Sequence, residues 1–169
     1  QRIFIMIALS TLQSHLHTTT NNPHKRFGED SKGLNEFIGA LQITNISLTK
    51  ILKEIESCEL EDCISAEELQ TLQNNACVRI EEIIQNTKFM GTPLFDTPLS
   101  AKVNGSMKDI CFDNPLSLSQ DFSAMKGFIE DKRAESNDLL LKLSEALLAP
   151  SNKRFESVDS TKLATMLKG

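Results

Sequence analysis

Residues 86–96, Asn-Thr-Lys-Phe-Met-Gly-Thr-Pro-Leu-Phe-Asp, decide how the parts of this chain are joined. They follow a segment with helical periodicity and precede short extended segments. Pro93 keeps the helix from continuing, and Gly91 offers a backbone position without a side chain. Phe89 and Leu94 supply apolar anchors. The stretch therefore predicts a joint between helices and strands, and nothing in it is suited to bind a substrate.

Residues 34–56 carry the first helical pattern upstream of the joint. Leucines and isoleucines recur there at steps of three and four, which places them along one side of an α-helix. Ile43, Ile46 and Ile51 widen that stripe. We therefore expect this helix to have neighbours on more than one face.

A second helix is predicted over residues 65–87. Ser65 and Glu68 have the spacing of a capping box, in which the hydroxyl and the carboxylate bond to free amides at the helix start. A short connection separates this helix from the first, which predicts an antiparallel hairpin. The residues expected to be buried in it are Leu72, Ile80 and Ile83.

A small β-hairpin is expected after the joint. Asn104-Gly105 is typical of a two-residue β-turn, because both positions of that turn need a positive φ. Extended segments at 101–103 and 106–112 flank it, and Asn114-Pro115 ends the extended region.

A long helix is predicted from Leu118 to Leu148, with Pro150 as its stop. Lys132 and Ser136 interrupt its apolar stripe halfway. A short amphipathic helix is expected over residues 160–168.

The sequence as a whole predicts a mainly α fold, a bundle of three long helices with a small β-hairpin region. Residues 1–33 are expected to be flexible or partly helical, with a loop or disordered linker over 17–33. Residues 34–149 form the bundle, with the hairpin near 94–113. Residues 150–169 are expected to be a linker and a short C-terminal helix.

Composition argues against several classes of function. The net charge of −5 disfavours nucleic acid as a partner, because phosphates require a basic surface. A membrane span is not expected, since no apolar run approaches the required length. The sequence lacks a Gly-rich phosphate loop and a nucleophile set beside a plausible base, so we expect no catalytic residues, no cofactor and no enzyme activity.

The cysteines and histidines are the candidate metal ligands of the sequence. Cys58, Cys63, Cys77 and Cys111 do not form paired C-x-x-C units, so reduced structural thiols are expected rather than a zinc site. Cys58 and Cys63 flank the turn between two helices and are close enough in sequence to pair. The three histidines lie in a polar segment without acidic neighbours, which favours surface histidines.

Leucines near the end of the long helix exceed what one helix face can hold. Residues 139–148 read Leu-Leu-Leu-Lys-Leu-Ser-Glu-Ala-Leu-Leu, so apolar side chains extend around the helix. Surplus apolar surface of this kind is typical of a partner site, although core packing is an equally good interpretation. The residues predicted to bind a partner are Leu139, Leu140, Leu143, Leu147, Leu148, Leu163, Met166 and Leu167.

The order of these motifs resembles the conserved helical core of bacterial flagellins. The similarity rests on an Ile-Gly-x-Leu-Gln stretch within residues 34–56, on the Ile-Glu-x-Ile…Asn-Thr ending of residues 65–87, and on the joint itself. Met90 departs from the flagellin pattern, where Asn is usual, and Thr97 departs where Gly is usual. The large variable outer domains of flagellins are missing.

The resemblance implies a non-enzymatic, protein-binding role in flagellar assembly. Flagellins are held unpolymerised in the cytoplasm by the export chaperone FliS, so a compact flagellin-like chain is expected to bind FliS there as a co-chaperone, with flagellin as a second partner. The first alternative is a minor exported structural component of the filament or hook-junction type, and the second is a helical adaptor with no flagellar role. The polar, Pro- and Gly-containing residues 10–33 and the cysteines favour the co-chaperone.

Overall fold

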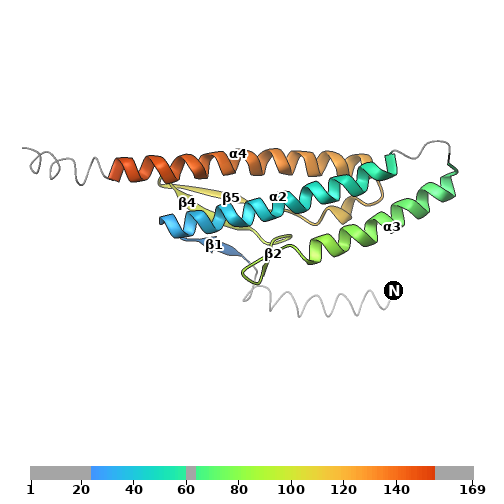
Figure 1. Cartoon of the computed structure of the whole chain (residues 1–169), viewed down its shortest axis with the longest axis horizontal. Helices are drawn as coiled ribbons and strands as arrows, with labels where there is room; N and C mark the ends of the chain where they lie inside the picture. The colour runs from blue at the N-terminus through green and yellow to red at the C-terminus, as the bar shows by residue number, and fades with distance from the viewer. Residues whose placement is uncertain (1–23, 60–63, 155–169) are drawn as a thin grey trace, which may run out of the picture.

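The computed structural model describes residues 24–59 and 64–154. Figure 1 shows α2, α3 and α4 as long helices, with a small sheet beside α2. The predicted class, mainly α with three long helices and a small β region, is confirmed. The elements in chain order are β1 (Lys25–Phe27), α2 (Ser31–Glu59), α3 (Ala66–Gln85), β2 (Lys88–Phe89), β3 (Thr92–Pro93), β4 (Leu99–Val103), β5 (Ser106–Ile110), the 3-10 helix η1 (Pro115–Leu118) and α4 (Phe122–Arg154).

α2 is the element on which most of the others pack. α4 runs antiparallel along it, and α3, β1, β2 and β4 contact it as well (Figure 1). The expectation of neighbours on more than one face is therefore confirmed. Ile51 is fully buried, whereas Ile46 remains 58% exposed. Each fully buried Leu or Ile side chain contributes about 1.5–3 kcal/mol, so this shared helix supplies much of the core.

α2 and α3 form the predicted antiparallel hairpin (Figure 1). The capping box is present, because the Glu68 amide donates to Ser65 Oγ at 3.0 Å and the Ser65 amide donates to Glu68 Oε1 at 2.9 Å. Ile80 is fully buried as predicted, while Leu72 and Ile83 are only partly buried. The hairpin therefore follows the pattern, with a narrower buried stripe on α3 than expected.

The β-turn at Asn104-Gly105 is confirmed. Both residues have positive φ, 53° and 80°, and they connect the antiparallel strands β4 and β5. Leu99 pairs with Ile110 at the far end of that hairpin, and both side chains are buried.

β1 corrects the expectation of a loop over residues 17–33. Residues 25–27 pair in parallel with β4, which completes a three-stranded sheet in the order β1-β4-β5. The Phe27 ring is buried and stacks on Phe37 of α2, with ring centroids 4.8 Å apart. A strand this short has no periodicity to detect, because its partner lies more than seventy residues away.

Gly33 is also more than a marker of a loop. A Cβ atom at this position would lie 2.1 Å from the carbonyl oxygen of Gly28, so the first turn of α2 and the chain before it can approach only through a glycine. The Gly33 amide donates to Asp30 Oδ1 at 2.8 Å, which supports the start of the helix.

The N-terminal end of the third helix differs from the prediction. Leu118 belongs to η1, which begins where the Asn114 side chain accepts a hydrogen bond from the Leu116 amide at 2.9 Å. α4 itself begins at Phe122, where Asp121 Oδ1 accepts from the Ala124 amide at 3.1 Å.

The C-terminal end of the helix differs too. Pro150 was expected to stop the helix, and α4 instead continues to Arg154. The fixed φ of proline is compatible with a helix, and its cost is one lost backbone hydrogen bond and crowding against the preceding turn. The division of the chain into 1–33, 34–149 and 150–169 stays a prediction, although β1 ties residues before 34 to the bundle and α4 crosses the boundary at 150.

Candidate partner-binding site

The predicted partner-binding leucines of α4 fall on different sides of the helix. Leu139 and Leu143 are buried in the core. Leu140 and Leu147 are partly buried against it, and Leu148 is 70% exposed. In this conformation α4 therefore offers only part of the predicted set to a partner, and an acidic substitution at Leu143 would test folding before it tested binding.

Leu141 joins Leu148 as an accessible apolar residue. The two are seven residues apart, which is close to two helical turns, so they lie on the same side of α4. Leu141 is 58% exposed. The sequence prediction omits Leu141 from the site, although its spacing from Leu148 was the signal for a shared face.

The remaining predicted site residues, Leu163, Met166 and Leu167, lie outside the described residues. Their part in partner binding stays a prediction.

The joint is held to α2 by a buried pair of hydroxyl groups. Ser47 Oγ and Thr87 Oγ1 are 2.6 Å apart, and Thr87 Oγ1 also donates to the carbonyl oxygen of Ile83 at 2.6 Å. The Leu94 amide donates to the carbonyl of Thr87 at 3.1 Å, and Leu94 is fully buried. These contacts give the joint a fixed position on the bundle.

Phe89 anchors the other side of the joint. A Cβ atom on Gly39 would lie 3.2 Å from Phe89 Cε1, so the ring rests on the glycine of the Ile-Gly-x-Leu-Gln stretch. The same ring is 6.4 Å from the Phe27 ring. The glycine in α2 therefore makes room for the phenylalanine of the joint.

Asp96 fastens the end of the joint to the segment after β5. Its backbone amide donates to the carbonyl of Phe112 at 2.7 Å, and its Oδ1 accepts from the Asn114 amide at 2.9 Å. Asp96 has a φ of 61°, a conformation in which aspartate is tolerated.

Met90 stands at the tip of the β2–β3 turn with a φ of 52°, followed by Gly91 at 81°. Its side chain is 72% exposed. A methionine in this left-handed conformation is unusual, whereas asparagine, the residue that the resemblance to flagellin leads us to expect here, suits it.

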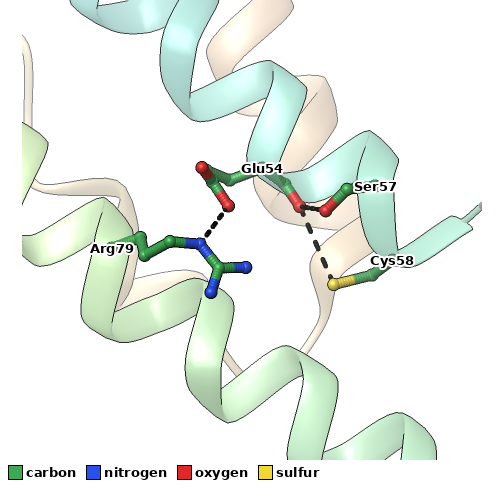
Figure 2. Close-up of polar contacts among 4 residues, drawn as sticks. All are labelled: Glu54, Ser57, Cys58 and Arg79. Atoms are coloured by element: carbon green, nitrogen blue, oxygen red, sulfur yellow. Dashed lines mark hydrogen bonds and ion pairs between the residues drawn. The ribbon is translucent and has the colours of Figure 1, made fainter.

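A groove of about 330 Å³ runs between α2 and α3 beside the Ser47–Thr87 pair. Figure 2 shows Arg79 of α3 reaching Glu54 of α2, and the Arg79 Nε to Glu54 Oε1 distance is 2.6 Å. The groove's charged lining, Lys50, Glu54, Arg79 and Glu82, has both signs. It therefore has no net preference for an anion or a cation.

The described cysteines are un-ionised thiols at neutral pH. Burial raises the pKa of Cys58, which lies next to Glu54 in Figure 2, and burial also raises the pKa of Cys77. Burial, with the Asp113 carboxylate beside it, raises the pKa of Cys111 to about 11. None of these three thiols is activated as a nucleophile.

The described residues offer neither a metal site nor a membrane span. Among residues 24–59 and 64–154, no group of three or more His, Cys, Asp or Glu side chains could hold a metal ion. Within the same ranges, every helix is too short or too polar to cross a bilayer.

The chain matches a family model described as "Flagellar FLiS export co-chaperone, HP1076" over residues 6–151. No curated protein matches the sequence. Among solved structures, the crystal structure of Bacillus cereus flagellin is similar, with a TM-score of 0.61 and 12% sequence identity. The similarity covers 79% of this chain and 97% of the flagellin chain. At that identity the likeness shows the fold alone.

The fold thus confirms the resemblance to flagellin that the joint and its two preceding helices indicated. The family match extends over most of the described bundle, from before β1 into the last turns of α4. The chain therefore belongs to the flagellar FliS export co-chaperone family.

Proposed function

We propose that this chain binds the export chaperone FliS as a flagellin-like co-chaperone and that it acts without catalysis. The match of residues 6–151 to the co-chaperone family carries the proposal. The flagellin-like fold supports it, because FliS is the chaperone that holds flagellin before export. The complex forms in the cytoplasm, where FliS meets its clients, and flagellin is the second partner that the shared fold favours.

The binding surface proposed for this role lies on the C-terminal half of α4. Leu141 and Leu148 are directly accessible there, and Leu140 and Leu147 are partly so. Apolar anchors of this size supply most of the binding energy at interfaces, provided that the partner offers a matching pocket.

Co-elution tests the proposal. The full-length chain and FliS, mixed at micromolar concentration, are expected to leave a sizing column as one complex whose mass by light scattering equals the sum of the two chains. Separate elution at the masses of the free proteins would overturn it.

A minor exported structural component remains the second candidate, because a fold that covers 97% of a flagellin chain suits packing between subunits. The two roles differ in where the chain is found. Self-assembly of the purified chain, or its presence in isolated filaments together with no FliS complex, would favour the structural role.

A further inference from the structure

α4 has an interruption in the middle of its buried face. Met125 and Ile129 are buried in its first half, and Leu139 and Leu143 are buried in its second half. Over residues 130–138 Ser136 is the one buried side chain. Between Ile129 and Leu139, which are more than two turns apart, the helix therefore buries a hydroxyl group in place of an apolar side chain, and Lys132 and Arg133 are partly buried.

α2 is polar at the same level. Asn45 Nδ2 donates to Asn137 Oδ1 at 2.9 Å, which sets this part of α2 opposite residues 136 and 137 of α4. Thr44 is buried beside it, and its hydroxyl donates to the carbonyl of Ala40 in its own helix at 2.8 Å. Thr44, Asn45, Ser136 and Asn137 are called the polar layer below.

Two atoms of the polar layer are poorly satisfied. Ser136 Oγ and Asn45 Oδ1 are buried, and neither has a hydrogen-bond partner among the described residues. A buried polar atom without a partner is less stable than the same atom in water. These two atoms therefore favour separation of the two helices at this level, whereas the Asn45–Asn137 hydrogen bond, which is exposed to solvent, and the apolar layers on either side oppose it.

The two halves of α4 are held differently. At the start of the helix, Lys126 Nζ lies 3.0 Å from Glu59 Oε1 and 3.8 Å from Glu56 Oε2, so this half is tied to the end of α2. The second half is held by Leu139, Leu143 and Ala146, which are buried. If released, that half would be a helix with leucines on every side, at positions 139, 140, 141, 143, 147 and 148.

We propose that the polar layer is a built-in break in the α2–α4 interface and that residues 137–148 separate from α2 as one unit. The separated helix then binds the export chaperone through Leu139 and Leu143. This second step rests on the proposed function, and the first step does not. In this proposal Leu141 and Leu148 bind the chaperone together with Leu139 and Leu143, which become accessible only on separation, so affinity falls in proportion to any loss of the separated form.

Hydrogen exchange of the full-length chain tests the first step without any partner. An unpacked helix of this length is only marginally stable, so its amides exchange once it leaves α2. Residues 137–148 are expected to exchange together, and at least about tenfold faster than residues 124–135. Equal protection of the two halves would overturn the proposal.

Ser136→Ala tests the link between separation and binding. The change removes the unpaired hydroxyl without adding volume, so the packed form becomes more stable relative to the separated form. The hydrogen exchange of residues 137–148 is therefore expected to slow about three- to tenfold. Affinity for purified FliS, measured by titration calorimetry, is expected to weaken by the same factor. The matched control is Ser144→Ala, an exposed serine on the same helix, which is expected to change neither quantity by more than about 1.5-fold.

The outcomes separate the two steps. Slower exchange with unchanged or tighter binding in Ser136→Ala would show that FliS binds the packed form, which overturns the docking step. If the wild-type chain forms no complex with FliS, the proposed function fails with the docking step, while the exchange data still decide whether the polar layer is a break.

Discussion

Ser47 and Thr87 meet inside the core, with their hydroxyl oxygens 2.6 Å apart, and this bond ties the middle of α2 to the first residue after the C-cap of α3. Both side chains are buried. The Thr87 hydroxyl also bonds to the carbonyl of Ile83, so one side chain ends the helix and positions the joint that follows. The threonine of the Asn-Thr motif therefore has a structural role that the sequence pattern alone did not reveal.

Thr87→Val is expected to lower the free energy of unfolding by about 1–3 kcal/mol, because it keeps the shape of the side chain and leaves Ser47 without its buried partner. Urea denaturation measures the change. The matched control is Thr71→Val on the exposed side of α3, whose hydroxyl makes the same bond to a carbonyl four residues earlier, at 3.1 Å. A loss no larger than that of the control would show that the buried pair adds no stability.

Gly33→Ala is expected to destabilise the fold by more than about 2 kcal/mol, since the added Cβ would meet the carbonyl oxygen of Gly28 at 2.1 Å and the backbone would have to move. Gly127→Ala is the control, because nothing lies within 4 Å of the Cβ that it adds. That change is expected to stabilise α4 by about 0.5–1 kcal/mol. The midpoint temperature of thermal unfolding should fall in Gly33→Ala and rise in Gly127→Ala. A Gly33→Ala protein as stable as the wild type would contradict the close approach of Gly33 to Gly28.

Ile80→Ala is expected to cost about 2–4 kcal/mol through lost burial and the cavity left behind. Ile80 is fully buried between α3 and the bundle, whereas Val78 on the same helix is 64% exposed. Val78→Ala is therefore expected to change stability by less than about 0.5 kcal/mol. Chemical denaturation compares the two, and a similar small loss in both would mean that Ile80 is not packed as described.

Cys111 is expected to make the fold sensitive to alkaline pH. Its folded pKa of about 11 lies above the ordinary value of 9.0, so the folded chain keeps the thiol proton at pH values where the unfolded chain releases it. The stabilising contribution is complete below pH 9 and is lost as the pH rises toward 11. The free energy of unfolding, measured by chemical denaturation at several pH values across this range, should fall less steeply with pH for Cys111→Ala than for the wild type. Equal slopes for the two proteins would rule out the linkage.

Leu148→Asp is expected to weaken binding to FliS by more than about 2 kcal/mol if that side chain is an anchor of the interface. The side chain is exposed, so circular dichroism should show an unchanged fold. Val78→Asp adds the same charge to a similarly exposed position on α3 and is expected to bind as the wild type does. Normal binding by Leu148→Asp would place the docking surface away from this face of α4.

The sequence by itself determined the class of fold, the α2–α3 hairpin with its capping box, the turn at Asn104-Gly105 and the likeness to flagellin. These depend on periodicity and on local backbone geometry, which neighbouring residues encode together. The tertiary structure alone decided that residues 25–27 add a parallel strand to β4, that Gly33 meets Gly28, and that Leu139 and Leu143 lie in the core while Leu141 and Leu148 do not. Each of these depends on an element distant in sequence. A helix with leucines on every side does not reveal which of its faces the rest of the chain covers, because burial belongs to the packed pair and not to the helix.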